Sequence, residues 1–254
     1  LTLRTQAEVD AFARSGINTV EGNLTIGGED EENPVTNLDG LKNLVSVRCD
    51  LTITAAYTGE TLAGLENLTA CESLRIGSAA HPNETLRQLS LPALKEIKGD
   101  LCVYGTALQT ADFKSLQSVA GHFVLQSDAL LQLTADELTT VAGNMTLIGT
   151  TADEAKAPCE QMYFPKLQRI DGTLTLSRFD RLSGLGTTFG VLTQAGALRY
   201  EHLALANTFE FPLIETTGNI TVTDCPILRS VLLPALTDAG SLEITGCPAI
   251  ETLS

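Results

Sequence analysis

The sequence has no Trp, few aromatic residues and few histidines. Its 254 residues include 5% aromatic residues and three His. Basic residues are scarce as well, because 16 Lys and Arg stand against 31 Asp and Glu, for a net charge of −15. Proteins that bind nucleic acid or an anionic membrane need clustered Lys and Arg. The composition therefore argues against both kinds of partner.

Long apolar runs and enzyme motifs are missing too. No apolar run approaches the ~20 residues that span a bilayer, so we expect no membrane insertion by this segment. No signal peptide stands at the start, so any export signal is expected to have been removed or never to have been present. There is no Gly-x-Ser-x-Gly elbow, phosphate-binding loop or Cys-x-x-Cys pair. We therefore expect no catalytic residues, cofactor or metal site.

A recurring motif predicts the architecture. Gly, then Asn or Asp, precedes an apolar, a polar and an apolar residue, as at 22–26, 143–147 and 218–222. The first apolar residue of each copy serves as a marker, and the spacing averages about 24 residues, within the range of leucine-rich repeats. The ten markers are Leu24, Leu51, Leu74, Leu101, Phe123, Met145, Leu174, Leu203, Ile220 and Leu242.

Alternation places the two apolar residues of each short strand on one face and the polar residue on the other. Such strands bury their apolar face only when copies stack, which predicts a mostly β, parallel β-solenoid of about ten turns. We expect one domain, with a helical cap at 1–16 and repeats at 17–254. Thr5 and Glu8 have the spacing of a capping box, and Gly16 is placed to end the helix in the left-handed conformation.

A longer unit identifies a resemblance. Residues 91–103 and 164–176 both read Leu/Phe-Pro-x-Leu-x-x-Ile-x-Gly-x-Leu-x-Val/Leu. This unit resembles the receptor L domain of insulin-type and epidermal-growth-factor-type receptors and of fungal cell-wall proteins. Together with the helix at 5–12, it looks closer to leucine-rich-repeat surface proteins of Gram-negative bacteria. The resemblance implies a right-handed solenoid and an exported binding protein, anchored at the bacterial surface or outer membrane or secreted.

Two columns of the repeat have alternative interpretations. The Asn and Asp side chains after each Gly could stack into a cation site, but we expect them to bond the backbone at a tight turn. The outward strand position is rich in Thr, which suits a solvated face or a docking surface. It comprises Thr25, Thr52, Arg75, Cys102, Val124, Thr146, Thr175, Ala204, Thr221 and Glu243.

Insertions between the repeats are the better candidates for ligand contacts, because binding residues concentrate on loops carried by a rigid scaffold. They lie near 57–61, 79–85, 150–162 and 178–197, and we expect the acidic run 29–34 to be a solvated loop. Arg178, Phe179 and Arg181 gather two cations and a ring, so we predict a contact there.

Cys225 and Cys247 share one phase of the repeat, 22 residues apart, and each precedes Pro. We expect their sulfurs to touch, either as a disulfide or as two thiols that fill a gap. Cys49 and Cys71 are one residue out of phase.

The sequence thus predicts a non-enzymatic, surface-exposed or secreted protein that binds a protein or a glycan. One alternative is a structural or adhesive component of the cell envelope. A third is a carbohydrate-active β-helix enzyme, which would need paired carboxylates about 5–9.5 Å apart on the outward face.

Overall fold

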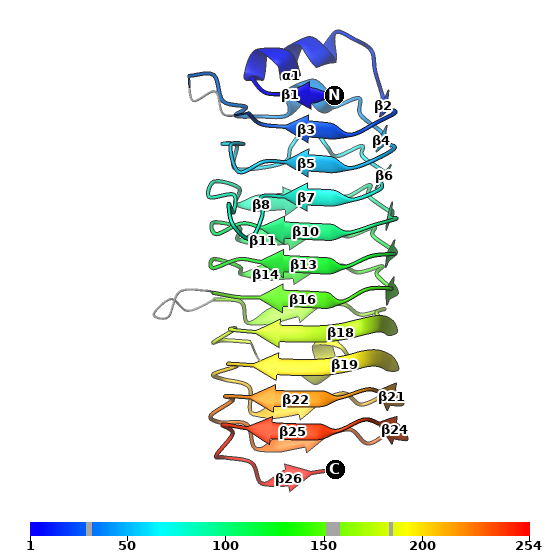
Figure 1. The fold of residues 1–254 in the computed structure, drawn as a ribbon, viewed down its shortest axis with the longest axis vertical. Coiled ribbons are helices and arrows are strands. Elements are labelled where there is room, and N and C mark those ends of the chain that lie inside the picture. Colours follow the sequence, from blue (N-terminus) through cyan, green and yellow to red (C-terminus); the bar gives the residue numbers. More distant parts are fainter. Residues whose placement is uncertain (29–31, 151–157, 183–184) are drawn as a thin grey trace.

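The computed structural model describes residues 1–28, 32–150, 158–182 and 185–254. In these residues the chain is a parallel β-solenoid of about eleven turns with few helices, so the predicted fold is confirmed (Figure 1). Its strands stack in rows along the long axis, and the buried side chains of all turns form one continuous cluster.

Each turn contributes one strand to the first row, whose solvent side we call the outer face. Neighbouring strands of this row pair in parallel. The strands are β1 (Thr2–Leu3), β3 (Leu24–Ile26), β5 (Leu51–Ile53), β7 (Leu74–Ile76), β10 (Leu101–Tyr104), β13 (Phe123–Gln126), β16 (Met145–Ile148), β18 (Arg169–Ser177), β19 (Gln194–Glu201), β22 (Ile220–Thr223) and β25 (Leu242–Thr245).

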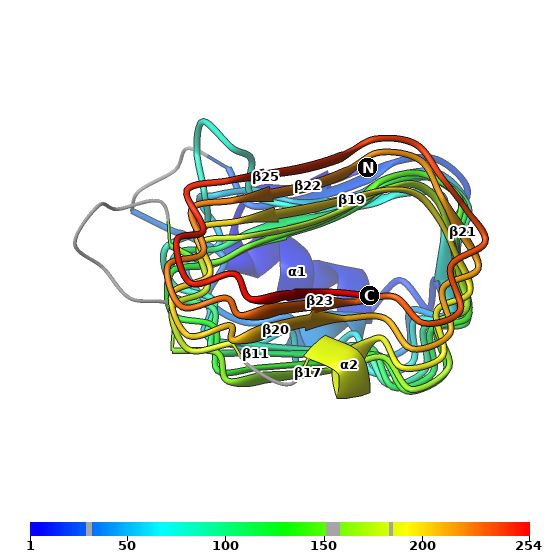
Figure 2. The same cartoon turned by 90° about the horizontal axis from the view of Figure 1, so that it is seen from below.

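A second row of two-residue strands lies on the narrow side of the rod, and β18 and β19 run through both rows (Figure 2). Its other members are β2 (Thr19–Val20), β4 (Ser46–Val47), β6 (Ala70–Cys71), β9 (Glu96–Ile97), β12 (Ser118–Val119), β15 (Thr140–Val141), β21 (Thr216–Thr217) and β24 (Asp238–Ala239).

The side opposite the outer face consists of two smaller sheets. They comprise β8 (Gln88–Ser90), β11 (Thr110–Asp112), β14 (Gln132–Thr134) and β17 (Gln161–Tyr163), then β20 (Thr208–Glu210), β23 (Ser230–Leu232) and β26 (Thr252–Leu253). The helices are α1 (Gln6–Ala13), the 3-10 turn η1 (Asp39–Leu41) and α2 (Leu185–Thr188).

The buried column predicted from the repeat is present. Leu24, Leu51, Leu74 and Leu101 face one another in register across β3, β5, β7 and β10. All four are fully buried. The alternation of the sequence therefore decides which side of each strand faces the core.

The structure has one turn more than the sequence analysis expected, and one marker was wrong. Strand β1 pairs with β3 and adds a turn before the first marker. In β19 the residue that faces Leu174 is Leu198, not Leu203. The error arose because Gly196 is followed by Ala197, which lacks the Asn or Asp of the motif, while an apolar pair recurs at Leu203 and Leu205. Thr2 and Arg199, rather than Ala204, complete the outward column.

Helix α1 covers the first turn, as predicted. Thr5 and Glu8 form the capping box, and Val9 and Phe12 are buried under the helix. Gly16 has a φ of 68°, which is the left-handed conformation expected after the helix.

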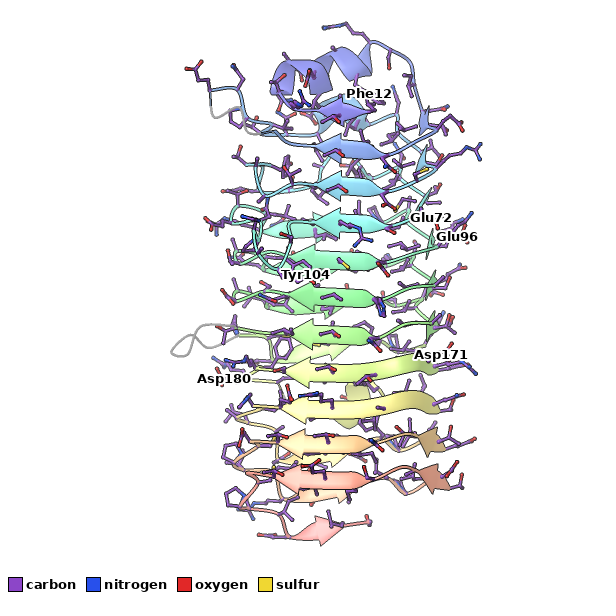
Figure 3. All side chains as sticks on the ribbon, in the orientation of Figure 1. Phe12, Glu72, Glu96, Tyr104, Asp171 and Asp180 are labelled. Atoms are coloured by element: carbon purple, nitrogen blue, oxygen red, sulfur yellow. The ribbon has the colours of Figure 1, made fainter. Side chains whose placement is uncertain are left out.

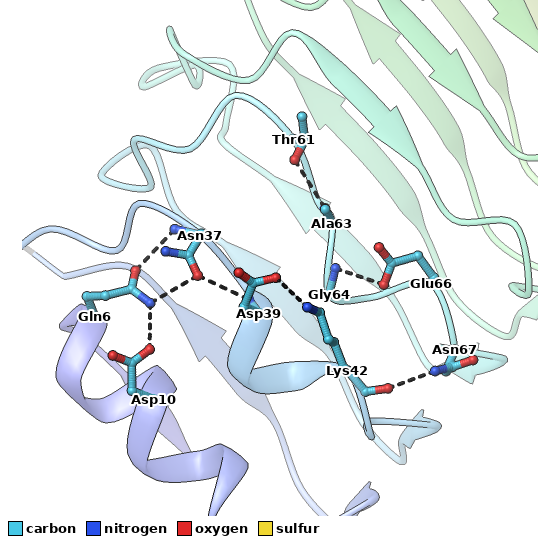
Figure 4. A network of polar contacts seen from close by, with 10 residues as sticks. All are labelled: Gln6, Asp10, Asn37, Asp39, Lys42, Thr61, Ala63, Gly64, Glu66 and Asn67. Atoms are coloured by element: carbon cyan, nitrogen blue, oxygen red, sulfur yellow. Dashed lines mark hydrogen bonds and ion pairs between the residues drawn. The ribbon is translucent and has the colours of Figure 1, made fainter.

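Polar contacts attach α1 to the turns beneath it (Figure 4). The Gln6 Oε1 atom accepts hydrogen bonds from the backbone N–H groups of Thr36 and Asn37, at 2.9 and 3.1 Å. Asn37 in turn accepts a bond from the N–H of Asp39, which forms an ion pair with Lys42 at 2.9 Å. The cap is therefore held by a network as well as by apolar packing.

Candidate functional site

The outer face carries a hollow near the capped end, and we call it the N-terminal hollow. It has a volume of about 600 Å³. Its floor is formed by outward side chains of β5 and the residues after it, and its sides by the segments after β3 and β7. The described residues that line it are Gly27, Gly28, Thr52, Thr54, Ala55, Ala56, Gly77, Ser78 and His81.

Small residues at the strand ends make room for the hollow. Gly27 has a φ of 95°, and a Cβ there would lie 2.4 Å from the Thr54 Oγ1 atom. Gly77, at the equivalent place after β7, has a φ of 60°. Residues with side chains rarely adopt this conformation, so glycine lets the chain turn here, and the missing Cβ leaves room for the Thr54 hydroxyl.

The loop after β7 forms one wall and projects beyond the outer face (Figure 2). Ser78 and His81 close it through reciprocal backbone hydrogen bonds of 2.9 and 3.2 Å. The fully buried Asn83 fixes its base, because its Nδ2 atom donates to the Tyr57 carbonyl at 2.8 Å. Its Oδ1 atom accepts from the N–H of Leu86 at 2.7 Å. The wall is thus held in place by the insertion after β5.

The insertions predicted near 57–61 and 79–85 therefore meet at one place. Tyr57 itself is buried, and its hydroxyl donates to the Thr61 carbonyl, so its ring supports the loop rather than the surface. Burial holds the pKa of Tyr57 well above its usual value. Residues 78–81 are all exposed, and His81 is the one titratable side chain among the described lining residues.

A polar cluster on β7 and β10 adjoins the hollow. The Arg75 Nη2 atom lies 3.1 Å from the Asp100 Oδ2 atom, and the Arg75 Nη1 atom lies 4.0 Å from the Cys102 sulfur. Tyr104 follows on the same strand, and its carbonyl accepts a 2.9 Å bond from the N–H of Asn83 at the loop (Figure 3). Cys102 and Tyr104 are both half-buried.

Burial and charge set the ionisation of this cluster. The backbone N–H of His122 and the Arg75 guanidinium lower the pKa of Asp100 against the opposing effect of burial. Burial raises the pKa of Cys102, and it raises that of Tyr104 as well. The thiol and the phenol are therefore neutral near pH 7, and the cluster offers hydrogen bonds and an ion pair rather than a nucleophile.

The Asn and Asp column is structural, but in a different way from the one expected. These side chains bond the backbone of the next turn, not of their own turn. The bonds run from Asp50 N to Asn23 Oδ1, Asp100 N to Ser73 Oγ, His122 N to Asp100 Oδ1, Asn144 N to His122 Nδ1, Thr173 N to Asn144 Oδ1 and Ser241 N to Asn219 Oδ1. We call this series the side-chain ladder.

The ladder explains several of the glycines in the repeat. A Cβ at Gly121 would lie 2.4 Å from the Asp100 Oδ1 atom, and one at Gly172 would lie 2.2 Å from the Asn144 Oδ1 atom. Only glycine leaves space for the side chain of the turn above. Because the ladder oxygens accept backbone hydrogen bonds, the column does not gather free ligands for a cation.

The predicted contact at Arg178, Phe179 and Arg181 does not form a surface cluster. Phe179 is fully buried, so its ring belongs to the core and is not exposed for the predicted contact. Arg178 has a φ of 61° and is partly buried. Arg181 forms an ion pair with Glu160. The motif was misleading because Phe179 points into the core of its turn. The sequence does not show this direction, because the insertion that follows interrupts the repeat.

Two other expected insertions are only partly described. The acidic run at 29–34 and the insertion at 150–162 include residues 29–31 and 151–157, which lie outside the described residues. The insertion at 178–197 is partly regular, because it contains α2 and the first residues of β19.

Cys225 and Cys247 are both free thiols in the structure, the first buried and the second partly exposed. Burial raises the pKa of Cys225 to about 11, and the neighbouring Cys247 thiol adds to this effect through its charge and a side-chain hydrogen bond. The pairing of Thr223 with Thr245 places the two cysteines at equivalent positions of neighbouring turns.

Two other features, a metal site and a membrane-spanning helix, are not found in the part of the chain that the structure describes. Among the described residues, no group of three or more His, Cys, Asp or Glu side chains is placed to hold a metal ion. No helix in the described ranges has the length and apolarity required to cross a membrane. Comparisons of the chain with family models, curated proteins and solved structures find no match.

Proposed function

We propose that the chain is a non-enzymatic, surface-displayed or secreted protein that binds a glycan in the N-terminal hollow. We also propose that its turns are leucine-rich repeats of the receptor L domain kind and that it comes from the surface of a bacterium. The solenoid serves as a rigid scaffold, and Gly27 and Gly28 after β3, together with the loop after β7, shape the site on its outer face.

One observation carries the proposal: the hollow is a concave site of about 600 Å³ on a face that is otherwise a regular stack of strands. Small-ligand sites typically have volumes of about 300–1,000 Å³ with a few polar groups that orient the ligand. A protein partner needs a contact of about 800 Å² on each side, which suits a broad flat surface better. The size of the hollow favours a short stretch of sugar.

The chemistry of the lining supports the same ligand. Thr52, Thr54 and Ser78 offer hydroxyl groups that both donate and accept hydrogen bonds, as sugar hydroxyls require. His81 adds a ring nitrogen at the rim, and Tyr104 lies beside the loop that carries it. The arrangement can bind an uncharged sugar through many weak polar contacts.

A binding role without catalysis is supported by the outward column. The charged side chains among its described members are Arg75, Arg199 and Glu243. The carboxylate beside Arg75 is that of Asp100, which also accepts a hydrogen bond from the backbone N–H of His122. Cleavage of a glycosidic bond needs two carboxyl groups about 5–9.5 Å apart around the sugar. The lining residues that the structure describes supply none.

A structural or adhesive role remains a second candidate, favoured by one observation. The apolar columns end exposed at the last turn, where Leu242 and Leu253 are 47% and 56% exposed. These exposed apolar side chains offer a surface for contact with another envelope component. Concentration-dependent self-association, measured by analytical ultracentrifugation, would favour this role over ligand binding.

A glycan array with the purified chain tests the proposal, and two substitutions locate the site. Thr52→Arg places a long side chain in the hollow, beside Arg75 on the next strand. Thr221→Arg is its matched control, because Thr221 lies in the same outward column, faces Arg199, and is far from the hollow. We expect Thr52→Arg to weaken binding of the array ligand at least tenfold and Thr221→Arg to leave it unchanged.

Equal binding by both variants and the parent chain would exclude the hollow as the site. Loss of binding in both variants would place the ligand elsewhere on the outer face. Surface exposure is a separate question, which antibody labelling of intact source cells decides. Labelling only after the cells are lysed would contradict the proposed location.

A further inference from the structure

The last two turns carry cysteines at equivalent positions. Strands β22 and β25 pair in register, with Thr223 opposite Thr245. Cys225 and Cys247 each lie two residues further along, so they face each other across neighbouring turns. The Cys247 thiol is close enough to raise the pKa of the Cys225 thiol, after the larger effect of burial.

The chain bends in the same way around both cysteines. The residues before them, Asp224 and Gly246, have φ values of 53° and 66°. The carbonyl of each cysteine accepts a hydrogen bond from the N–H three residues later. Each thiol donates to the carbonyl two residues earlier, from Cys225 to Thr223 at 3.5 Å and from Cys247 to Thr245 at 3.4 Å, so the two side chains have the same orientation on neighbouring turns.

The same core column holds large apolar side chains in the preceding turns. Its members there are Phe179 and Leu203, which are fully buried. Cysteines take the place of these residues in the last two described turns. Cys225 is buried and Cys247 is partly exposed. The two cysteine side chains fill less space than Phe and Leu, but their thiols can be joined in a covalent bond.

We propose that Cys225 and Cys247 are the site of an oxidative modification, a disulfide that staples the last turn of the solenoid to the turn before it. Turns of a parallel stack are about 4.8 Å apart, within the Cα separation of about 4.4–6.8 Å that disulfides adopt. The small approach that the two Cβ atoms still need falls on Cys247, which is partly exposed and so less tightly packed than the buried Cys225.

The reaction is a thiol–disulfide exchange with a small disulfide such as oxidised glutathione. The partly exposed Cys247 loses its proton to solvent, and its sulfur attacks one sulfur of the reagent and expels a thiolate. Cys225 then loses its proton and attacks the Cys247 sulfur, which releases the second thiolate. Two protein thiols are oxidised to one disulfide, and one molecule of reagent is reduced to two thiols.

The chain contains its own control for this geometry. Cys49 and Cys71 also lie on neighbouring turns, but their positions are not equivalent, because Cys71 ends strand β6 and faces Ile97, whereas Cys49 lies between β4 and β5. Cys71 is buried, and the Cys49 thiol is directed to the Glu21 carbonyl. This pair is therefore not expected to join.

Oxidation of the purified chain with oxidised glutathione tests the proposal. We expect the thiol count under denaturing conditions to fall from the six cysteines of the chain to four. Trypsin cleaves after Arg229, between the two cysteines, so mass spectrometry should find peptides 200–229 and 230–254 joined with the loss of two hydrogen atoms. Hydrogen exchange in 242–253 should slow roughly a hundredfold, because the bond closes a loop of about 20 residues.

Two variants keep the result interpretable. Cys247→Ser alters a partly exposed position and should abolish both the cross-link and the slower exchange. Cys225→Val keeps an apolar side chain in the column and should do the same while the chain stays folded. Retention of all six thiols, or a glutathione adduct on Cys247 that is never displaced, would overturn the proposal. A cross-link without slower exchange would overturn the role as a staple.

Discussion

The two ends of the solenoid are built differently. At the first turn, α1 places Val9 and Phe12 over the core, and the Gln6 side chain ties the helix to residues 36–37. At the last described turn, Leu242 and Leu253 continue two buried columns but are 47% and 56% exposed. Their neighbours in the previous turn, Ile220 and Val231, are 2% and 1% exposed.

This contrast follows from the nearest-neighbour character of a solenoid. Each turn contacts only the turns beside it, so stability is approximately a sum of turn and interface contributions. A turn in the middle has two interfaces, and an end turn has one unless something covers it. The helix supplies the second interface at one end. A given apolar side chain should therefore contribute more to the free energy of unfolding in a middle turn than in the last described turn.

The largest test compares two leucines of one column. Leu101 is fully buried between β7 and β13, whereas Leu242 lies in the last strand of the row and is half exposed. Leu101→Ala should lower the free energy of unfolding by ~2–5 kcal/mol, because it leaves a cavity between two turns. Leu242→Ala should cost less than about 1 kcal/mol, since the side chain keeps much of its contact with water. Urea denaturation followed by circular dichroism measures both, and equal losses would contradict the nearest-neighbour explanation.

A smaller test removes the capping box. The Thr5 Oγ1 atom accepts a hydrogen bond from the N–H of Glu8 at the start of α1. Thr5→Ala should destabilise the protein by about 1 kcal/mol, the usual value for loss of such a cap. Hydrogen exchange should increase most in β1 and β3 beneath the helix. Thr252→Ala, at the exposed last strand, is the control and should change neither quantity; a similar loss there would show that the ends are equivalent.

The smallest test concerns the side-chain ladder and its response to acid. Asp100→Ala removes the acceptor for the His122 N–H and should cost under about 1 kcal/mol at pH 7. Asn219→Ala, which affects the bond to Ser241 in the last turn, should cost less. Asp100→Asn keeps the oxygen acceptor that Asn23 and Asn144 use in other turns, so it should retain most of the stability.

The pH dependence has a definite sign. The His122 N–H, followed by Arg75, lowers the pKa of the Asp100 carboxyl below its usual value, against the effect of burial. The ionised carboxylate therefore stabilises the folded chain above its unfolded pKa, and this contribution disappears as the pH falls through the lower folded value. Thermal melts between about pH 6 and pH 2 should show the parent chain losing stability relative to Asp100→Asn. Parallel curves would contradict this role of Asp100.

The repeat could be predicted because its signal is local and recurs in nearly every turn. The marker at Leu203 was wrong because only there did a competing apolar pair follow a turn that lacks the Asn or Asp. Phe179 was misassigned for a related reason, since an insertion hides the register that makes it equivalent to Leu203. The ladder was expected as a local turn contact, and its true partners are 22 to 29 residues away.

The amino-acid sequence by itself determined the parallel stack, its buried column and the helix over the first turn, because alternation, glycine spacing and capping are properties of neighbouring residues. Tertiary structure alone decided the eleventh turn, the bonds between turns and the N-terminal hollow. The hollow requires segments after β3, β5 and β7 to meet on one face, although they are separated by more than twenty residues. Their meeting depends on how far each turn advances and where each insertion projects, and these are consequences of packing rather than of any single motif.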